Sequence, residues 1–556
     1  MADVKTNDVM EKIVSLCKRR GFIYQSSEIY GGINGFWDYG PLGAELKRNV
    51  RDRWWRAMTH MRDDVVGLDA TIIMHPKVWV ASGHVDTFAD PMSTCKVCKK
   101  LLRSDQVLEM LGEAEWAKTV YSFWNDGNVD TEKLLQWAHS KGHRQAPGLA
   151  LVKKPEQVVS ALKNMLSLNK NIGKLDFFKV LATDPETQTK LVTPCPYCGG
   201  ELTEPRMFNL MFKTHVGPVE DDENIAYLRP ETAQAIFVQF KNVLETSRQK
   251  VPFGICQIGK AFRNEVTPRN FTFRSREFEQ MELEFFIRPD EVVEKIAGRV
   301  ARWSEGADVS TPQPDWGWEM WHRHWVEERL KWYESIGLSR DTLELYWQKK
   351  EELAHYARAC VDIQFKFPFG TQELEGIAAR GDFDLTQHQK HSGKSMEYFD
   401  EEAKTKYVPH VIEPSAGVDR LVLALICNAY SEDEVPDEKG KPEQRVVLRF
   451  HPSIAPIKVG VFPLLKNKPE LVQKAKAIRE MLRPHMTVFY DDSGAIGRRY
   501  RRQDEAGTPF GITVDFDTLG ETPSLKETVT VRDRDTTKQE RVKIDELLPY
   551  LKEKIK

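Results

Sequence analysis

The chain has 556 residues, of which 41% are hydrophobic, with 80 Lys and Arg against 83 Asp and Glu. This length corresponds to about three or four domains, and the composition excludes a mainly disordered or fibrous protein. The net charge of −3 excludes a uniformly basic nucleic-acid binder, although one domain can still carry a basic face.

No stretch of the sequence approaches the roughly 20 apolar residues of a membrane helix, and the N-terminal segment lacks the apolar core of a signal peptide. Four of the eight cysteines stand alone and the other four form two CxxC pairs. This usage favours a reducing compartment and a metal site over a disulfide framework. We therefore expect a cytoplasmic protein with no membrane partner.

The N-terminal part predicts two helices, a strand and an inserted module. The first helix covers residues 9–20, and after a Gly- and aromatic-rich stretch Pro41 suits the first turn of a long helix that reaches about Met61. A strand-like run follows and stops at Pro76. Residues 95–198 are charged amphipathic helices bracketed by the CxxC pairs, which predicts a helical insertion.

The middle of the chain is rich in strand patterns, which occupy residues 207–216, 252–265, 271–287, 366–385 and 407–426. The third of these alternates apolar and charged residues, as a strand with one polar face does. Residues 299–350 hold seven of the fourteen tryptophans on charged helical segments, which predicts packing within a small helical insertion rather than ligand stacking. Residues 431–445 read as a polar, acidic linker.

From residue 455 to the end, strands and helices alternate, which predicts a separate compact α/β domain. Its antiparallel ending suggests a mixed sheet. The sequence has no phosphate loop of the GxxxxGK[ST] kind, so ATP would have to bind by another device.

Short motifs carry the chemistry. FRNE (262–265) and RSREF (274–278) place arginines, a carboxylate and an aromatic ring on one hairpin. Arginine directs hydrogen bonds to phosphate oxygens, and a ring stacks on a purine. EPSAGVDR (413–420) turns from a polar strand end into an apolar helix, and RPETAQ (229–234) and QELEGIA (372–378) complete the set. Each alone also fits an exposed hairpin or a capped helix; their joint occurrence in this order is more specific.

In this order the motifs resemble those of class II aminoacyl-tRNA synthetases, in particular the bacterial-type homodimeric glycyl-tRNA synthetases of class IIa. The long helix and the strand ending at Pro76 resemble the first class motif, which forms the dimer interface in that family. FRNE with RSREF resembles the second motif, and the turn from Gly417 to Arg420 the third. WVASGHVDTFADP, RPETAQ, ELEGIAARGDFDL and EPSAGVDR resemble glycyl-type signatures, and the likeness runs from Gly21 to about Leu548. Only Gly417 remains of the several glycines of the general third motif, which fits the glycyl subfamily.

The resemblance implies an α+β fold: an antiparallel catalytic sheet flanked by helices, with helical insertions and a C-terminal α/β anticodon-binding domain. We expect catalytic-core parts at 1–94, 199–298 and 351–454, insertions at 95–198 and 299–350, and the anticodon-binding domain at 455–556.

The resemblance also implies a ligase that activates glycine with ATP and Mg²⁺, releases pyrophosphate, and transfers the glycyl group to the 3′-terminal adenosine of tRNA(Gly). A side synthesis of diadenosine tetraphosphate stays open. The implied catalytic residues are Arg263, Glu265 and Arg420. The implied ATP-binding residues are Arg263, Asn264, Glu265, Phe273, Arg274, Arg276, Phe278, Glu373, Leu374, Gly417 and Arg420. In that reading Phe278 stacks under adenine with Arg420 above it, and Glu373 helps to hold Mg²⁺.

Glycine offers no side chain to grip, so its affinity must come from its ammonium and carboxylate groups, and larger amino acids must be excluded by bulk. The implied glycine-binding residues are Arg103, Glu231, Phe278, Glu282, Glu413, Ser415 and Gly417. Clustered carboxylates suit an ammonium group. The sequence leaves open whether Glu282 or Glu284 faces the ammonium, and Arg103 is equally well explained as a surface arginine.

Two further sets of residues point to a metal and to RNA. Each CxxC pair, Cys95 with Cys98 and Cys195 with Cys198, has the form of a zinc knuckle. The four thiolates could together bind Zn²⁺ tetrahedrally, and four unliganded thiols are the alternative. The run Arg498, Arg499, Tyr500, Arg501 and Arg502 suits phosphate contacts and base stacking. A solvated basic helix would also explain this run, but the resemblance to class IIa anticodon-binding domains favours tRNA contact.

Two alternatives compete with this reading. A catalytically silent nucleic-acid-binding relative, like the mitochondrial polymerase accessory subunit, need not keep the ATP residues, and all of them stand here. A class IIa synthetase for another amino acid is opposed by Glu231 and Glu413 and by the absence of a threonyl-type zinc triad.

Overall fold

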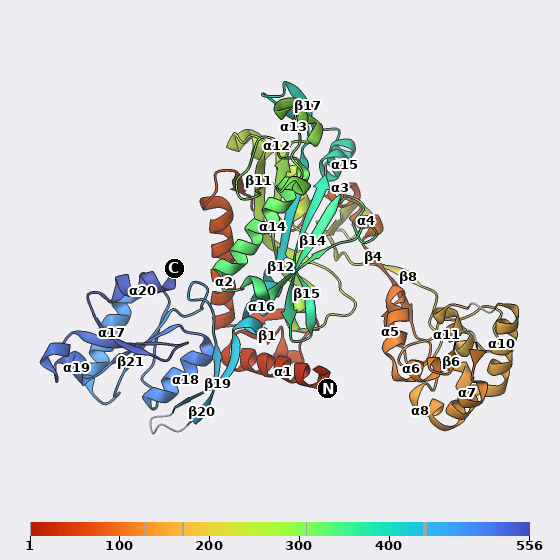
Figure 1. Ribbon diagram of the computed structural model, residues 1–556, viewed down its shortest axis with the longest axis horizontal. Coiled ribbons are helices and arrows are strands. Elements are labelled where there is room, and N and C mark those ends of the chain that lie inside the picture. The colour runs from red at the N-terminus through yellow and green to blue at the C-terminus, as the bar shows by residue number, and fades with distance from the viewer. Residues whose placement is uncertain (1, 126–127, 170–171, 307, 437–441) are drawn as a thin grey trace. The chain divides into compact units, whose positions relative to one another are not determined.

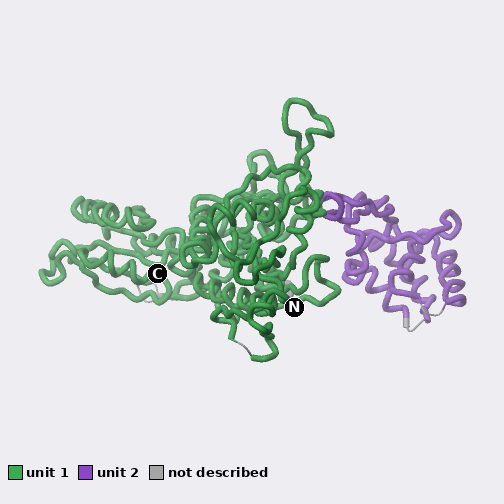
Figure 2. Tube along the Cα trace, turned by 90° about the horizontal axis from the view of Figure 1, so that it is seen from above, with its two compact units in different colours: residues 1–84, 211–556 green, residues 85–210 purple. Residues whose placement is uncertain are grey.

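The structure is a computed structural model that describes residues 2–125, 128–169, 172–306, 308–436 and 442–556 (Figure 1). The chain forms two compact units, residues 1–84 with 211–556 and residues 85–210 (Figure 2). The second unit is therefore an insertion into the chain of the first. It contains the expected insertion at 95–198 together with a strand on either side. None of the helices in the described residues is both long and apolar enough to cross a membrane.

The first segment of the main unit is mainly helical, and its first helix begins before the expected start at residue 9. Its elements are α1 (Ala2–Arg20), β1 (Ile23–Gln25), β2 (Trp37–Tyr39), α2 (Pro41–Trp55), β3 (Val65–Gly67) and α3 (Pro76–Ala81). The short helix α4 (His84–Thr87) begins at the last residue of this segment and continues into the second unit. Pro41 opens α2 as predicted, and a π-helical turn extends this helix to His60. The predicted strand ending at Pro76 is wrong: only β3 is a strand, and Pro76 opens α3, where its missing N–H needs no partner.

A seven-stranded sheet in the order β13-β14-β15-β18-β12-β11-β3 forms the centre of the main unit. Besides β3, its strands are β11 (Phe253–Phe262), β12 (Glu277–Ile287), β13 (Leu343–Trp347), β14 (Ala359–Phe367), β15 (Gly370–Gly381) and β18 (His410–Gly417). Neighbouring strands are antiparallel except for the parallel pair β11–β3. The expected antiparallel core is thus confirmed.

Side-chain alternation along β12 gives the sheet one apolar and one polar face. Met281, Leu283 and Phe285 belong to the large core that includes residues of α2, α14 (Trp318–Ser335) and α16 (Val418–Ala429). On the other face, Phe286 packs against Phe237 of α12 (Ala233–Ser247). Towards the start of β12 this second face carries polar residues, and the functional site forms there.

The Trp-rich segment is part of the main core rather than an insertion with a core of its own. Trp321 and Trp325 of α14 lie against Phe285, with ring centroids 4.9 and 5.1 Å away. The segment ends in β13, which pairs with β14 as an edge strand of the central sheet. Trp316, Trp321, Trp325 and Trp332 belong to the main core, whereas Trp303 and Trp347 are exposed.

Smaller elements complete the main unit: β9 (Lys213–His215), β10 (Ile225–Tyr227), α13 (Asp290–Ala297), α15 (Phe383–Ser392), β16 (Tyr398–Asp400) and β17 (Thr405–Tyr407). The expected linker at 431–445 is instead a hairpin of β19 (Tyr430–Pro436) and β20 (Pro442–Leu448); residues 437–441 lie outside the described ones. The expected strand at 207–216 is two strands, because β9 pairs with β10 whereas β8 (Arg206–Asn209) belongs to the second unit.

The C-terminal part has the expected mixed sheet, in the order β22-β21-β23-β24-β25. Its elements are β21 (Val459–Pro463), α17 (Pro469–Leu482), β22 (Val488–Tyr490), α18 (Ile496–Ala506), β23 (Phe510–Val514), α19 (Phe516–Leu519), β24 (Thr528–Asp533), β25 (Gln539–Lys543) and α20 (Leu547–Ile555). β21 is parallel to β22 and β23, and the last two pairs are antiparallel.

The second unit is mainly helical and has its own core, which includes Trp116, Phe177 and Phe178. Its strands are β4 (Ala89–Thr94), β5 (Leu101–Arg103), β6 (Trp124–Asn125), β7 (Asn128–Val129) and β8. Its helices are α5 (Val107–Glu113), α6 (Glu115–Tyr121), α7 (Thr131–Trp137), α8 (His143–Gln145), α9 (Ala150–Lys153), α10 (Pro155–Leu168) and α11 (Lys174–Ala182).

Candidate functional site

A cavity of about 160 Å³ opens on the polar face of the central sheet, where β12, β15 and β18 lie side by side. Its wall includes Arg263, Glu265, Phe273, Arg274, Phe278, Glu373, Leu374, Ser415, Gly417 and Arg420. The structure thus brings together all the residues expected to bind ATP except Asn264 and Arg276. Arg276 instead donates hydrogen bonds to the carbonyl oxygens of Glu265 and Asn34.

Opposite charges pair along the wall of this cavity. Arg274 Nη2 lies 2.6 Å from Glu265 Oε2, and Arg420 Nη1 lies 3.2 Å from Glu373 Oε2. Glu373 is about half exposed, so Arg420 can turn to an incoming anion, whereas Glu265 is buried and holds Arg274 at the wall. The wall can therefore supply directed N–H donors to phosphate oxygens.

Two arginine–ring contacts define where a flat group could lie. The guanidinium of Arg263 lies 5.3 Å from the ring centre of Phe278, and that of Arg420 lies 4.7 Å from the ring centre of Phe273. In this structure Arg420 therefore covers Phe273, whereas the resemblance implied a place above Phe278. Arg263 is also fixed through its Nε, which donates to the carbonyl oxygen of Pro230 at 3.0 Å.

The start of α16 is anchored by a buried aspartate that the sequence reasoning missed. Asp419 accepts hydrogen bonds from Lys47 Nζ at 2.7 Å, Tyr39 Oη at 2.6 Å and the backbone N–H of Glu279 at 2.6 Å. Burial alone would raise the pKa of Asp419, but Lys47 and these donors hold it below its usual value. This network positions the next residue, Arg420. An aspartate in the first turn of an apolar helix was the signal available in the sequence.

A cluster of buried carboxyl groups adjoins the cavity. Glu282 and Glu284 occupy alternate positions of β12 and so share its polar face. Glu282 accepts hydrogen bonds from the backbone N–H of Thr232 at 3.0 Å and from Ser415 Oγ at 2.7 Å. Among the described residues, neither carboxyl oxygen of Glu284 has a hydrogen-bond partner. Glu282 is therefore the one tied to the loop that carries Glu231.

Arg380 is the main residue of this cluster that the sequence reasoning did not select. Its Nη1 donates to Glu413 at 2.6 Å, and its Nε donates to Asp384 at 2.8 Å. The guanidinium also lies 4.0 Å from the ring centre of Tyr356. Only 3% of Arg380 is exposed, so it supplies a positive charge inside the cluster. The sequence carried a signal in the spacing of Arg380 and Asp384, which lie four residues apart within ELEGIAARGDFDL.

Burial and neighbouring charges give the clustered carboxyl groups different pKa values. Burial alone would raise the pKa of Glu231, but His84 and Arg380 outweigh it and hold this pKa well below its usual range. Burial raises the pKa of Glu282, and the charge of Glu231 raises it further. Burial raises the pKa of Glu413 to about 8, reinforced by the other carboxylates and partly offset by Arg380. Some of these carboxyl groups are therefore protonated at neutral pH, and the cluster carries less negative charge than it would if all of them were ionised.

Comparison with known proteins agrees with this geometry. Residues 212–305 match the model of the tRNA synthetase class II core domain (G, H, P, S and T), and residues 458–554 match that of the anticodon binding domain. The chain is 46% identical to the glycine–tRNA ligase of Thermus thermophilus, covering 98% of this chain and 99% of that protein. It is also 45% identical to the glycine–tRNA ligase of Thermobifida fusca, over 99% of this chain and 98% of that protein. The identity to the glycine–tRNA ligase of Rhodopirellula baltica is likewise 45%, over 98% of this chain and 99% of that protein.

The chain belongs to the glycine–tRNA ligase family. The class II core match covers β11, β12 and Glu231, and so includes part of both the cavity and the carboxyl cluster. The second match covers β21 to α20, the mixed sheet at the C-terminus. Both matches agree with the class II core and anticodon-binding domain expected from the motifs.

One of the glycine-binding residues implied by the likeness to the glycine–tRNA ligase family belongs to the other compact unit. Arg103 belongs to the second unit, where its Nη2 lies 2.7 Å from Asp105 and its Nη1 lies 3.2 Å from Asp90. Within its own unit Arg103 is therefore an ion-paired residue at the end of β5.

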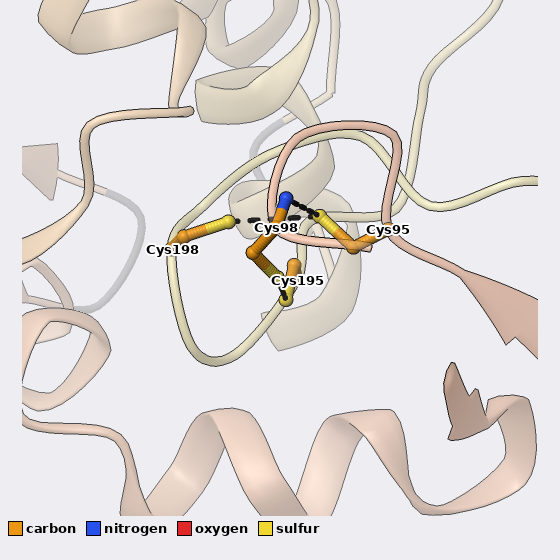
Figure 3. Close-up of side chains that lie close together, drawn as sticks. All are labelled: Cys95, Cys98, Cys195 and Cys198. Carbon is orange, nitrogen blue, oxygen red and sulfur yellow. Dashed lines mark hydrogen bonds between the residues drawn. The ribbon is translucent and has the colours of Figure 1, made fainter. Parts of the chain in front are cut away.

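The four paired cysteines of this ligase-family chain meet in the second unit and their donor atoms lie within 4.8 Å of one another (Figure 3). The Sγ atoms of Cys95 and Cys198 are 3.6 Å apart, and those of Cys98 and Cys195 are 3.7 Å apart. A tetrahedral zinc ion with Zn–S bonds of about 2.3 Å sets sulfur atoms about 3.8 Å apart, so these residues fit zinc. Hydrogen bonds from Lys100 and the other cysteines outweigh burial and lower the pKa of Cys98 to about 7, whereas burial raises the pKa of Cys198 to about 11 and that of Cys195 further.

The basic run lies on α18, in the segment that matches the anticodon-binding domain, and its members face different ways. Arg499 is 2% exposed, and its guanidinium donates to the carbonyl oxygens of Asp492 and Gly494. Tyr500 donates to or accepts from Thr513 Oγ1 at 2.6 Å. Arg499 is thus buried within this domain, and the Tyr500 hydroxyl bonds within it; the tRNA contact expected of both residues stays a prediction.

The other three arginines of the run reach its surface. Arg498 is exposed, Arg501 lies 2.7 Å from Glu443, and Arg502 lies 2.5 Å from Asp491. Ion pairs this accessible exchange readily with other anions, so these side chains remain suited to phosphate contacts.

Proposed function

We propose that the protein is a glycine–tRNA ligase that forms glycyl-adenylate from glycine and ATP and then charges tRNA(Gly). The observation that carries this proposal is the position of Ser415 between the first cavity and the carboxyl cluster. Ser415 lines the cavity that has the arginines and rings, and its hydroxyl donates to Glu282 of the carboxyl cluster. A nucleotide and a small ammonium compound bound in these two places would be neighbours, as adenylate formation requires.

In the first step the glycine carboxylate attacks the α-phosphorus of ATP, and pyrophosphate leaves. Arg263 would neutralise the α-phosphate and the attacking carboxylate, and Arg274 would meet the terminal phosphate. Phe278 and Phe273 offer ring faces for adenine, and Arg420 would cover it. Glu373 would help to hold Mg²⁺, which takes carboxylate and phosphate oxygens as ligands. Such catalysis rests on positioning and charge neutralisation.

The carboxyl cluster suits an amino acid that has no side chain. Glu231 is held in its charged form and can accept hydrogen bonds from the ammonium group, and Glu282 and Glu413, whose pKa values are raised, can accept further hydrogen bonds through their carbonyl oxygens. Arg380 limits the repulsion among these groups, so that the cluster stays folded before glycine binds. Thr232 and Ser415 fix the position of Glu282, and larger amino acids would be excluded by bulk at this place.

The remaining parts serve the RNA and the assembly. Transfer requires the 3′ end of tRNA at the adenylate, and Arg498, Arg501 and Arg502 would contact tRNA phosphates. Zinc at the four cysteines would stabilise the second unit without catalysing the reaction. We further propose a homodimer formed through the segment of α2 and a cytoplasmic location, which the eight free cysteines support.

The decisive experiment is ATP–pyrophosphate exchange with a panel of amino acids. Glycine should stimulate exchange, and alanine and serine should not. Glu231→Ala should abolish the stimulation because it removes the charged acceptor for the ammonium group, whereas Glu223→Ala, an exposed residue of the preceding loop, should leave it intact. Stimulation by alanine or serine but not by glycine would overturn the specificity, and no exchange with any amino acid would favour a silent relative.

A further inference from the structure

A second cavity, of about 670 Å³, lies outside the site described above and is lined by residues of α3, α12 and α15 and the loop after α15. α15 packs against both of the other helices (Figure 1). This volume lies within the range of about 300–1,000 Å³ that is typical of small-molecule sites. The cavity therefore has the size for a ligand such as a mononucleotide.

Lysines and histidines outnumber the acidic residues on the polar wall of this cavity. The wall contains His75, Lys77, Lys241, His388, His391 and Lys394, together with Asn242, Glu245, Ser392 and Ser395. Burial lowers the pKa of His388, so this ring adds no charge. Within the described parts of the chain, neither Lys77 nor Lys394 has a carboxylate at salt-bridge distance, and Lys241 has only Glu245, at 3.9 Å. Among the described residues, the geometry for a metal ion is found at the cysteine cluster and not at these histidines. The positive charge of these lysines therefore favours an anionic ligand.

The wall also has an apolar part, formed by Val78, Ala81, Val238 and Met396. An inorganic anion alone would leave this surface uncovered, whereas a nucleoside monophosphate presents both a doubly charged phosphate and a flat, weakly polar base. Lysine and imidazole N–H groups make strong, charge-assisted hydrogen bonds to phosphate oxygens.

One residue of the wall is linked to the carboxyl cluster. His388 Nε2 lies 2.8 Å from Gln234 Oε1, and Gln234 Nε2 donates to Glu231 at 3.0 Å and to Asp384 at 2.9 Å. Because the amide nitrogen of Gln234 serves the two carboxylates, its oxygen must accept, and His388 Nε2 must donate. Gln234 is fully buried, so a shift of the His388 ring is passed to the group that holds Glu231.

We propose that this cavity binds a nucleoside monophosphate unit and that its occupation changes the affinity for glycine through His388 and Gln234. The unit comes either from a free nucleotide or from the 3′ end of an RNA strand, which share this chemistry. The second half of the inference rests on the proposed function, and the first half does not.

Calorimetry on the full-length protein tests binding directly. Uridine 5′-monophosphate is the probe because it lacks the adenine that the first cavity is expected to select, and uridine and inorganic phosphate are the partial ligands. We expect the monophosphate to bind and uridine not to bind. Lys77→Ala/Lys394→Ala should weaken binding by about tenfold or more, since each loses a charge-assisted bond. Lys390→Ala, an exposed lysine of α15 outside the wall, is the control.

The outcomes separate the sources and the alternatives. If a trinucleotide ending in CCA binds more tightly than the free monophosphate and loses affinity in the double lysine variant, the site takes an RNA end. Equal affinity of the double variant and of Lys390→Ala for every probe overturns the site, as does the absence of binding by any probe.

The coupling is measured as the KM for glycine in ATP–pyrophosphate exchange, with and without saturating uridine 5′-monophosphate. A shift of about fivefold or more is expected in the unmodified protein, and its loss in His388→Phe. His388→Asn, which keeps a polar group, is the second variant if the first fails to fold. An unchanged KM overturns the coupling. A protein that activates no amino acid refutes the proposed function, while the calorimetry still reports on the cavity.

Discussion

Replacing Arg380 with methionine would remove the positive charge that bonds to both Glu413 and Asp384. Methionine retains an unbranched chain of similar length and can fill the space beside Tyr356 without a charge. The perturbation therefore acts mainly on electrostatics and hydrogen bonding rather than on packing volume.

The magnitude follows from the contacts that are lost. Arg380 makes a bond of 2.6 Å to Glu413 and bonds of 2.8 and 3.0 Å to Asp384, all of them buried. Removing one partner of a buried ion pair costs about 3–5 kcal/mol. Because the pKa of Glu413 is already raised to about 8, this group can become neutral at little cost, and the uncompensated charge falls on Asp384. We therefore expect a loss of about 3 kcal/mol at pH 7 and a larger loss at pH 9, where Glu413 is ionised.

The assay is urea unfolding at pH 6, 7 and 9, followed by tryptophan fluorescence, since several buried tryptophans lie in the same unit. Arg299→Met is the matched control, because Arg299 pairs with Asp315 at the surface and should contribute nothing measurable. Equal unfolding free energies for the two variants, or a deficit for Arg380→Met that grows as the pH falls, would refute the reasoning.

Three further predictions follow from the same structure. Cys98→Ser should remove bound zinc and make the second unit sensitive to protease, as measured by metal analysis and limited proteolysis; zinc retained in full would contradict the four-thiolate site. The pKa of Glu413 rises from its usual 4.5 to about 8 on folding, so the folded protein holds an extra proton between these values and stability falls as pH rises through this window. Glu413→Gln should flatten that fall in Tm between pH 5 and 9, and an unchanged slope would contradict it. Arg499→Ala should lower the free energy of unfolding of the C-terminal domain by about 3 kcal/mol, because buried donors to carbonyl oxygens are lost. Arg498→Ala should instead raise only the KM for tRNA, by roughly threefold. Calorimetry and charging assays that show the reverse pattern would contradict these two assignments.

The residues of the first cavity could be predicted from the sequence because they come from local motifs. FRNE follows from the end of β11 and RSREF leads into the start of β12, so the hairpin formed by these two strands brings Arg263 and Phe278 close together. Arg380 and Gln234 could not be found in this way, because their partners come from other elements. The sequence alone does not distinguish a buried arginine from a surface arginine, because the carboxylates that surround it in the fold are not known.

Other differences from the sequence predictions have simple physical origins. Pro76 ended a strand-like run, and proline both excludes the middle of a strand and suits the first turn of a helix, so the sequence could not decide between them. The run from Arg498 to Arg502 covers more than one helical turn, and successive residues of a helix point about 100° apart. Some of its members had to face the domain, as Arg499 does. That outcome was available from helix geometry.

The discontinuous path of the chain has a consequence for biosynthesis. β3 ends at Gly67, but its parallel partner in β11 is not made until Cys256, after the whole of residues 85–210 has been synthesised. At about 5–20 residues per second, the N-terminal segment waits roughly 10–40 s on the ribosome for the sheet that will bury it. The inserted unit needs no such wait, because its core and both cysteine pairs are internal to it. The inserted unit can therefore complete its core before the last strands of the central sheet are synthesised.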